Sequence, residues 1–521
     1  MSLLGGTMLA RLALAGAGAL ILSHIAKCIY NLFFHPLRHI PGPWLAAATY
    51  IPEFYYDIVL GGRYTRQIQQ MHKKYGPIVR ISPHELHCND HRFINEIYAS
   101  GNKKRDKPAH QVTGSAGIQA LATFSTISHT THRLRRNALN KLFSHAQVLK
   151  LEPIVRTIGE QLCEKTLRTK KQQPFLVGHA YSQCTTDVIS GYCLGEKLGL
   201  LEGEDWEFGF SDELTKEFRL GYVLRFVPWW GDVLRAFERI RGLVMRQPEK
   251  ARASDAFIAN MPEYIKKAQT EVETKKDTET TKTTVFTSVL QSDLPAHEKT
   301  LDRMTSEGIS LFAAGTETVS WALTVATFHL LSRPEILTKL TADVAPFIND
   351  PERTSWSALE SVPYLGAVIH ESLRLSYGVA SRTARVPTDE DLVYRGEWEN
   401  KDMELVIPRG SAIGMSSAVT HHDESVFPDS HSFIPERWLD EKGQKRKDLD
   451  RALLSFSKGS RGCVGINLAY CELHLLLSLL VVRVFPHLKL YETTESDVAY
   501  DYDFFTMFPV ATSKGVRVVV V

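Results

Sequence analysis

A glycine-rich stretch with a single cysteine, FSKGSRGCVG at residues 456–465, constrains this chain most. It is followed directly by INLAYCELHLLLSLLVVRVF, which is apolar on most sides and predicts a buried helix. Cys463 is therefore expected at a loop-to-helix junction. At such a junction the free N–H groups and the positive end of the helix dipole favour a thiolate over a thiol. An anionic sulfur suits a nucleophile or a metal ligand, and this pattern alone leaves both open.

Length and composition bound the organisation of the chain. A chain of 521 residues would by the usual prior hold roughly two to four domains. No linker-like composition follows residue 45, however, so one large domain is preferred. The net charge of +2 gives no case for nucleic acid as a partner. The 7 cysteines show no CxxC spacing, which argues against a disulfide framework or a zinc site and suits a reducing compartment.

The N-terminus predicts a membrane anchor. Residues 12–34 are apolar and just long enough to cross a bilayer. A cleaved signal peptide is the competing reading, but nothing downstream resembles a secreted, disulfide-stapled protein. Lys27 and Arg38 follow the apolar core, with Arg11 before it, which weakly places the main domain on the cytosolic side. The expected organisation is a flank at 1–11, a transmembrane helix at 12–34, a proline-rich stalk at 35–45 and the main domain at 46–521.

The main domain is expected to be mainly α-helical with smaller β-sheets. Helical periodicity marks residues 151–169, 207–220, 232–246, 301–332, 333–347 and 357–376. Strand-like stretches fall at 77–87, 383–394, 403–416 and the C-terminal VRVVVV. The polar segment 266–285 predicts a solvated, mobile connection. VPWWGD at 227–232 indicates either a partly buried aromatic corner or a second surface that touches the membrane.

AAGTETVS, at residues 313–320, lies inside a long helical pattern. Ala314 and Gly315 remove bulk in the middle of the helix, while Thr316 and Thr318 can bond back to the preceding turn and loosen it. A gap beside an acid and a hydroxyl leaves room for a small ligand and a proton relay. A kinked core helix packed tightly against its neighbour would show the same pattern.

A third pattern predicts a buried ion pair. Glu371 and Arg374 in HESLRL are three residues apart and share one face of an apolar helix. A buried pair needs additional hydrogen bonds, because its desolvation can outweigh its mutual attraction. Arg437 in FIPERWLD is the expected additional partner.

Together these patterns resemble one known family. Phe456, Gly459, Arg461, Cys463 and Gly465 match the FxxGxRxCxG haem loop of the cytochrome P-450 monooxygenases. The AGTET, ExxR and PERW motifs precede it in that family's order and spacing. The similarity spans essentially the whole chain and is closest to fungal microsomal members. It implies the cytochrome P-450 fold, preceded by one transmembrane helix.

The resemblance implies a haem b cofactor with Cys463 as the axial ligand of its iron. Phe456 and Gly465 would lie beside the sulfur and the macrocycle. The expected partners of the haem propionates are Arg461, Arg385, His132 and Arg136, although a change of register would promote Arg135 instead. A solvated basic helix face is the alternative for these arginines, and with Lys458 it could dock an acidic reductase.

Further roles follow from the same resemblance. Thr318 and Glu317 would form the catalytic acid–alcohol pair that delivers protons. Ala314 and Gly315 would form the groove for dioxygen. Glu371, Arg374 and Arg437 would be a structural triad that fixes the loop bearing Cys463.

The implied activity is insertion of one oxygen atom from O2 into a lipophilic substrate, by hydroxylation or epoxidation. Electrons would come from NADPH through a separate cytochrome P-450 reductase, with cytochrome b5 as an optional second donor. The implied location is the endoplasmic reticulum membrane. The implied substrate is a secondary metabolite such as a terpenoid, polyketide or indole alkaloid.

The pocket would be lined by residues 108–126, 377–382 and 503–508, with Ser381, Arg382 and Thr506 able to orient a polar group. Two rival activities stay open. One is a haem-thiolate isomerase or dehydratase that needs no external electrons. The other is a membrane-tethered haem protein without turnover.

Overall fold

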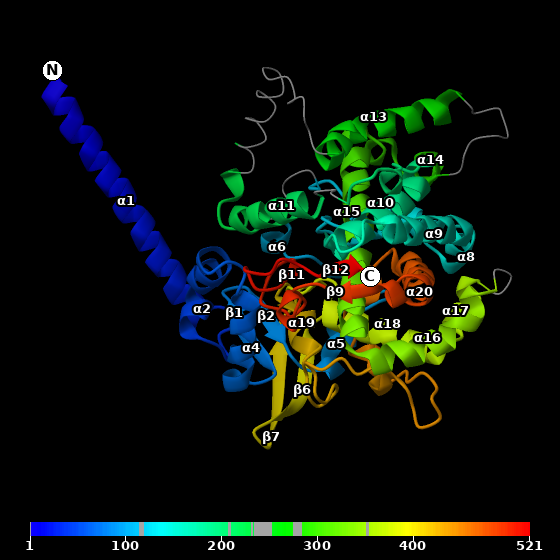
Figure 1. Cartoon of the computed structure of the whole chain (residues 1–521). Helices are drawn as coiled ribbons and strands as arrows, with labels where there is room; N and C mark the ends of the chain where they lie inside the picture. Colours follow the sequence, from blue (N-terminus) through cyan, green and yellow to red (C-terminus); the bar gives the residue numbers. More distant parts are fainter. Residues whose placement is uncertain are drawn as a thin grey trace.

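The structure is a computed structural model that describes residues 2–113, 119–206, 210–230, 233, 253–274, 284–350 and 354–521. Helices dominate it and the sheets are small, as predicted (Figure 1). The helices are α1 (Ser2–Phe33), α2 (Trp44–Ala48), α3 (Ile51–Phe54), α4 (Tyr64–Tyr75), α5 (Ile94–Ile97), α6 (Ala109–Thr113), α7 (His129–Asn140), α8 (His145–Leu149), α9 (Glu152–Arg168), α10 (Val177–Leu194), α11 (Phe210–Leu224), α13 (Ala253–Thr274), α14 (Val285–Gln291), α15 (Leu301–Ser332), α16 (Pro334–Ile348), α17 (Trp356–Glu360), α18 (Pro363–Ser376), α19 (Ser417–Thr420) and α20 (Ile466–Arg483).

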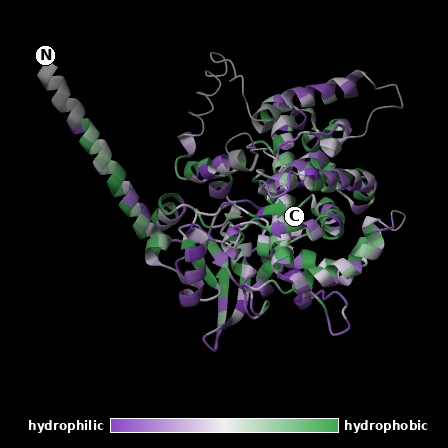
Figure 2. Ribbon diagram, viewed as in Figure 1, coloured by the Kyte–Doolittle hydropathy of each residue, from purple (hydrophilic) through white to green (hydrophobic). Residues whose placement is uncertain are grey.

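Helix α1 extends away from the rest of the molecule and is apolar along most of its length (Figures 1 and 2). Among the described residues, three helices have the length and composition to cross a membrane. In α15 and α20, 72% of the apolar window is buried inside the protein, whereas in Arg11–Phe33 none of it is. Those two helices are therefore core elements, and α1 is the candidate membrane span.

The proline-rich segment after α1 packs onto the body of the protein. Leu37 and Ile40 are buried. The Arg80 N–H donates to the Pro41 carbonyl over 2.8 Å. A Cβ at Gly42 would lie 2.4 Å from the Arg80 carbonyl oxygen, so only glycine allows this close approach. The direction in which α1 leaves the body is fixed by these contacts.

The strands form five small sheets within the described residues. Strand β2 pairs antiparallel with β1 and parallel with β8, which brings residues 85–87 beside 412–414. Strands β10 and β11 form a hairpin with Phe505 at its turn. The strands are β1 (Ile78–Ser82), β2 (Glu85–Cys88), β3 (Arg105–Asp106), β4 (Phe175–Leu176), β5 (Val386–Pro387), β6 (Leu392–Trp398), β7 (Lys401–Ile407), β8 (Ala412–Gly414), β9 (Leu488–Leu490), β10 (Tyr502–Phe504), β11 (Thr506–Phe508) and β12 (Arg517–Val520).

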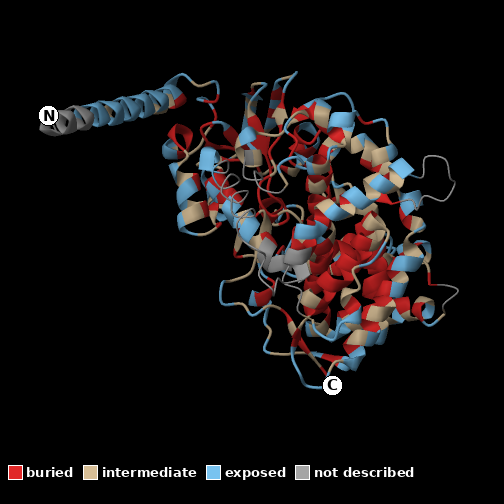
Figure 3. Cartoon of the chain, turned by 90° about the horizontal axis from the view of Figure 1, so that it is seen from above, coloured by how far each residue is buried: buried red, intermediate tan, exposed pale blue. Residues whose placement is uncertain are grey.

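The main apolar core lies between helices. Helix α15 runs through it and packs against α10, α13, α18 and α20. Figure 3 shows a block of buried helices within the body of the molecule, with the exposed N-terminal helix extending away from it. Helix α20 is buried on nearly all sides, which explains its almost continuous apolar sequence.

Most predicted helices are confirmed, and two expectations are wrong. The predictions at 151–169, 301–332 and 333–347 correspond to α9, α15 and α16. The single helix expected at 357–376 is instead α17 and α18, because Pro363 has no N–H for a continuing helix and starts a new one. Residues 266–274 are not a loose connection but the last turns of α13.

The remaining predictions need smaller adjustments. The helix expected at 207–220 is described from Phe210 and continues to Leu224. The one expected at 232–246 lies outside the described residues except for residue 233, as does 275–283 of the expected connection. Each predicted strand region inside the chain contains two shorter strands: β1 and β2, β5 and the start of β6, and β7 and β8. The C-terminal strand is confirmed as β12.

Candidate active site

The loop before α20 is held in place by backbone contacts. The Cys463 N–H donates to the Phe456 carbonyl over 2.8 Å, and the Ser460 N–H donates to the Ala99 carbonyl over 3.1 Å. Gly459 has a φ of +70°, and a Cβ there would lie 2.1 Å from the Tyr98 carbonyl oxygen. This position of the predicted motif therefore requires glycine.

Cys463 is the one exposed thiol among the seven free cysteines. Desolvation raises the pKa of Cys463, while the Gly465 N–H and Arg136 act in the opposite direction. Among the protein groups alone, desolvation therefore opposes the thiolate expected at the junction. A bound metal ion would reverse that balance.

Within the part of the chain that the structure describes, no group of three or more His, Cys, Asp or Glu side chains could hold a metal ion. A haem does not need such a group, because the macrocycle supplies its own nitrogen ligands and needs one axial thiolate from the protein. Cys463 can supply that thiolate.

Four cationic side chains converge on His132: Lys107, Arg136, Arg385 and Arg461. Burial and these four charges lower the pKa of His132 to about 2, so the imidazole is neutral. Burial and the charge of Arg385 lower the pKa of Arg461 to about 9, and burial with Arg385 and Arg461 lowers that of Lys107 far below its usual range. Asp106 provides some compensation near Arg461. Such a concentration of positive charge fits the two carboxylates of a haem.

The arginines of this cluster are rigidly placed. Arg461 donates to the backbone carbonyls of residues 105, 126 and 127 at 3.0, 2.7 and 2.6 Å. Arg136 Nη1 donates to the Gly462 carbonyl over 2.8 Å, directly beside Cys463. Arg135 instead pairs with Glu298 at 2.7 Å. Arg136, and not Arg135, therefore faces the cysteine loop.

Lys107 was not found from the sequence. It follows β3, its Nζ lies 3.6 Å from the centre of the Phe124 ring, and its ammonium donates to the Phe124 carbonyl. No motif marks it in KKRDKPAH, because its position depends on a two-residue strand pairing between β3 and β5.

Helix α15 exposes Ala314 and Thr318 although most of its residues are buried. They are four residues apart and so lie on one face of the helix. The Thr318 hydroxyl donates to the Ala314 carbonyl over 2.8 Å. The predicted small-residue gap and hydroxyl are thus combined on one open face.

Glu317 and Gly315 face a different neighbour. Glu317 Oε1 accepts a hydrogen bond from Ser182 of α10 over 2.6 Å. A Cβ at Gly315 would lie 2.9 Å from Cγ1 of Ile189 in α10. The small size of Gly315 therefore serves the packing of α15 on α10. Of the two small residues, Ala314 is the one that lies on the open face with Thr318.

The Glu371 carboxylate is fully buried and accepts five hydrogen bonds. Arg374 donates two, at 2.9 and 2.8 Å, and Arg437 donates one at 3.0 Å. The Trp438 indole and the Ile434 backbone N–H complete the set at 2.8 and 2.9 Å. The additional donors required for a buried ion pair are therefore present.

His421 joins this network to the cysteine loop and was missed by the sequence analysis. Its Nε2 accepts from the Leu454 N–H over 2.8 Å, so Nδ1 carries the hydrogen and donates to the Arg374 carbonyl over 2.8 Å. The Ser455 hydroxyl also donates to the Leu373 carbonyl over 2.7 Å. The segment that leads to Cys463 is thereby tied to the C-terminal end of α18.

Arg382 is paired with buried acids. Its guanidinium pairs with Glu85 at 3.0 Å and donates to Glu53, so it is not free to orient a substrate on its own. Thr506 is half-buried in β11 and Ser381 is buried. Between them, Phe505 packs its ring against Phe124 and Phe218, at 5.5 and 5.1 Å between ring centres.

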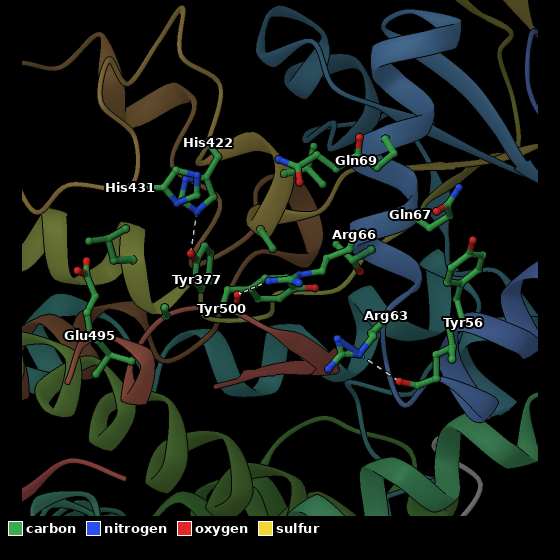
Figure 4. A pocket seen from close by; sticks show the side chains of 18 of the residues that line it. Tyr56, Arg63, Arg66, Gln67, Gln69, Tyr377, His422, His431, Glu495 and Tyr500 are labelled. Atoms are coloured by element: carbon green, nitrogen blue, oxygen red, sulfur yellow. Dashed lines mark hydrogen bonds between the residues drawn. The ribbon is translucent and has the colours of Figure 1, made fainter. Parts of the chain in front are cut away.

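A separate cleft of about 700 Å³ lies between α4, the end of α18 and residues 495–500 (Figure 4). The Tyr377 hydroxyl contacts His422 Nε2 over 2.7 Å, and the His422 ring stacks on His431 at 4.1 Å. No residue that lines this cleft belongs to the cation cluster, the cysteine loop or the open face of α15. The cleft is distinct from the candidate active site.

Comparison with known proteins decides the family. The family model described as cytochrome P450 matches residues 46–495, which include the cysteine loop, α15 and the Glu371 network. The chain belongs to the cytochrome P450 family. The resemblance noted in the sequence is thereby confirmed, and this P450 is a haem-dependent monooxygenase, an oxidoreductase that incorporates oxygen into a small molecule.

Similar curated proteins come from fungi. "Cytochrome P450 monooxygenase ppzE" of Metarhizium majus is 38% identical over 454 residues, which cover 84% of this P450 and 94% of that protein. "Tryptophan 6-hydroxylase fscE" of Fusarium equiseti is 37% identical over 513 residues, or 96% of each chain. "N-acetyltryptophan 6-hydroxylase ivoC" of Emericella nidulans is 35% identical over 496 residues, covering 94% of this P450 and 93% of that protein.

Proposed function

We propose that this P450 hydroxylates an indole-bearing small molecule in a secondary-metabolite pathway, with Cys463 as the axial ligand of its haem. The observation that carries the proposal is the single exposed thiol beside a cluster of four cations. A zinc-type site or a nucleophile would not need that much positive charge. A haem, which is flat and carries two carboxylates, does need that charge.

The residues around the cofactor have distinct roles in this proposal. Arg461, Arg385, Arg136 and Lys107 bind the propionates, and neutral His132 lies among them. When bound, the haem supplies the activation of dioxygen. Thr318 holds a proton donor on the open face of α15, and Ala314 leaves room there. Glu317, which accepts a hydrogen bond from Ser182, resupplies the protons. Glu371, Arg374 and Arg437 fix the cysteine loop.

An indole substrate is favoured over a terpenoid or polyketide by two observations. Two similar proteins are named for hydroxylation of tryptophan and N-acetyltryptophan. The expected pocket segments also contribute Phe124 and Phe505, which together with Phe218 form an aromatic group suited to a flat ring.

The proposed location is the endoplasmic reticulum membrane, with residues 12–34 as the single span, 35–45 as the stalk and 46–521 in the cytosol. Two exposed tryptophans support a second membrane contact in this arrangement: Trp229 is 62% exposed and Trp44 is 71% exposed. Phe54 and Phe226 join these two exposed regions, at 5.2 Å between ring centres. Electrons would come from an NADPH-dependent reductase, with cytochrome b5 as an optional second donor.

The carbon monoxide difference spectrum of the reduced, detergent-solubilised protein tests the central assignment. We expect the strongly red-shifted Soret band of a thiolate-bound haem, and its loss in Cys463→Ser. The same red-shifted band in the variant would refute the assignment.

NADPH consumption in the presence of a reductase separates the rival activities. Consumption that depends on substrate and yields a hydroxylated indole supports the monooxygenase. A rearranged product without consumption indicates the isomerase, and bound haem without any product indicates the non-catalytic haem protein.

A further inference from the structure

Each of the three segments expected to line the substrate pocket contributes a side chain to one buried cluster. His110 comes from 108–126, Arg382 from 377–382 and Asp503 from 503–508. The rest of the cluster comes from other elements: Glu53 in α3, Asp57 in the π-helical turn η1 (Tyr55–Val59), Glu85 in β2 and Arg225 just after α11. A cluster that only stabilised one helix or strand would not need side chains from so many separate segments.

Arg382 lies at the centre of the cluster. Its Nε is 3.0 Å from Glu85 Oε1, and its Nη1 is 4.0 Å from Asp57 Oδ2. Glu53 Oε1 accepts from Arg382, lies 3.1 Å from His110 Nε2 and is 3.9 Å from Arg225 Nη1. One oxygen of Glu53 therefore serves three partners.

Three polar atoms of the cluster are left without a hydrogen-bond partner in the described structure: Glu53 Oε2, Asp57 Oδ2 and Arg225 Nε. The side chains of Glu53 and Asp57 are 0% and 3% exposed, and that of Arg225 is 10% exposed. Buried polar groups in native proteins are almost always paired with protein or with ordered water, so each orphan calls for a water molecule or a ligand group. Here the orphans are two carboxyl oxygens and one guanidinium N–H.

The acids of the cluster differ in how far positive charge compensates their burial. Burial raises the pKa of Glu85 and of Asp503, although Arg382 opposes it at both. Burial raises the pKa of Asp57 to about 8, whereas Arg382, His110 and Arg225 overcome burial and hold the pKa of Glu53 at about 2. A cation placed beside Asp57 would favour its ionised form.

The cluster borders the aromatic group of Phe124, Phe218 and Phe505. The Tyr222 hydroxyl lies 3.4 Å from Asp503 Oδ1 and accepts from the Phe505 N–H over 2.9 Å. Phe505 belongs to the aromatic group with Phe124 and Phe218. A ligand could thus place an aromatic ring on one side of Tyr222 and a charged end on the other.

We propose that this cluster binds the zwitterionic end of an aromatic α-amino acid, with the ammonium group at Glu53 and Asp57 and the carboxylate at Arg225. The proposal rests on the proposed function, since it makes the indole substrate an amino acid such as tryptophan. The two orphan acceptors and the orphan donor match the two opposite charges of such a group. The lipophilic substrate expected from the sequence would then be lipophilic only at its ring.

The test is equilibrium dialysis of three indoles against the haem-loaded, full-length protein in detergent. L-tryptophan carries both charges, tryptamine lacks the carboxylate, and indole-3-propionate lacks the ammonium group. We expect L-tryptophan to bind at least tenfold more tightly than either of the other two. Binding of all three within about threefold of one another, or no binding of L-tryptophan, would overturn the proposal.

Two variants assign the charges separately. Arg225→Gln should weaken the binding of L-tryptophan and of indole-3-propionate about tenfold and leave the binding of tryptamine unchanged. Asp57→Asn, which keeps the shape of the side chain, should weaken the binding of L-tryptophan and of tryptamine and leave the binding of indole-3-propionate unchanged. Equal effects on all three indoles would show that the cluster only maintains the shape of the pocket, and would overturn the assignment.

Product analysis keeps this proposal separate from the proposed function. If the protein hydroxylates indoles without discriminating between their charged groups, the proposed function stands and the amino-acid site is refuted. If it binds L-tryptophan with the expected variant pattern but oxidises no indole, the site stands and the proposed function is refuted.

Discussion

His421 shows how one residue can connect the Glu371 network to the cysteine loop. Its neighbours fix its tautomer, with Nδ1 as donor to Arg374 and Nε2 as acceptor from Leu454. Burial lowers its pKa to about 3, so this arrangement does not change near neutral pH. Both bonds are buried, and a buried group that loses its partner costs about 1–3 kcal/mol.

We therefore expect His421→Ala to lower the free energy of unfolding by a few kcal/mol, at roughly 1–3 kcal/mol for each orphaned group, and to reduce haem retention. His421→Asn keeps a donor for the Arg374 carbonyl and should fall between Ala and the wild type. Urea unfolding and the haem content of the purified protein measure the two effects. The exposed His487→Ala is the matched control, with an expected change within about 0.5 kcal/mol. Full haem content and an unchanged midpoint in His421→Ala would contradict the bridging role.

Asp57 gives a second prediction at this scale. Burial raises its pKa from 3.8 to about 8, so between these values the folded protein holds a proton that the unfolded chain releases. Stability contributed by this group is therefore lost as the pH rises from about 4 to about 8. Asp57→Asn should remove that loss, giving a smaller decrease in the urea midpoint between pH 6 and pH 8. The exposed Asp343→Asn should behave as the wild type. Parallel pH profiles for Asp57→Asn and the wild type would refute the assignment.

Individual residues were predictable from the sequence where a motif carries them. Cys463 and Glu371 lie where their motifs predict. Arg382 was expected to face a substrate, but its charge is committed to acids more than 290 residues away in the chain. Lys107 and His421 carry no motif at all. Such long-range pairings depend on the folded topology, which one sequence does not specify.

At the scale of elements, the contact between α15 and α10 explains the glycine of the AGTET motif. Gly315→Ala would place a Cβ 2.9 Å from Ile189 Cγ1 and 3.3 Å from Ile189 Cβ, an atom that cannot move away by a rotamer change. Overpacking of this kind costs about 1–3 kcal/mol, which is at least as large as the gain of about 1 kcal/mol from alanine's helix propensity.

Gly315→Ala should therefore destabilise the protein in urea unfolding. Combining it with Ile189→Ala should be less damaging than the sum of the two single changes, because the clash is removed. Gly191→Ala in α10 is the control, since nothing lies within 4 Å of the added Cβ and the helix should be unchanged or more stable. Strict additivity of the two changes would show that Gly315 serves something other than this contact.

Helix boundaries show the same division between local and non-local causes. Local chemistry places the start of α18 at Pro363, and closer attention to that proline would have predicted it. Composition alone gave a wrong result for residues 266–274, because a polar surface helix and a solvated loop have similar sequences. Apolar periodicity does not distinguish a helix from a loop in so short a segment, because the apolar residues that pack α13 onto the protein lie in the earlier part of the helix.

At the scale of the whole molecule, buried neutral histidines dominate the acid side of the stability profile. Burial is the main cause that lowers the pKa in each of seven cases, to between about 2 and about 4 from the usual 6.5: His72, His132, His329, His370, His421, His422 and His474. Between pH 6.5 and those values the unfolded chain binds protons that the folded protein does not.

Stability contributed by these groups is fully present above pH 6.5 and is lost as the pH falls through that value. Each proton contributes a slope of about 1.4 kcal/mol per pH unit, so several histidines together outweigh the opposite slope of Asp57. We expect the urea midpoint to decrease steeply between pH 6.5 and pH 5, with a maximum near neutral pH. His329→Gln should reduce that slope by about one proton, because its imidazole is buried between Arg333 and Phe433. His297→Gln, at a side chain that is 77% exposed, should leave the slope unchanged. A flat profile between pH 5 and pH 6.5 would mean that the folded protein already accepts these protons, and that the buried histidines are not held neutral.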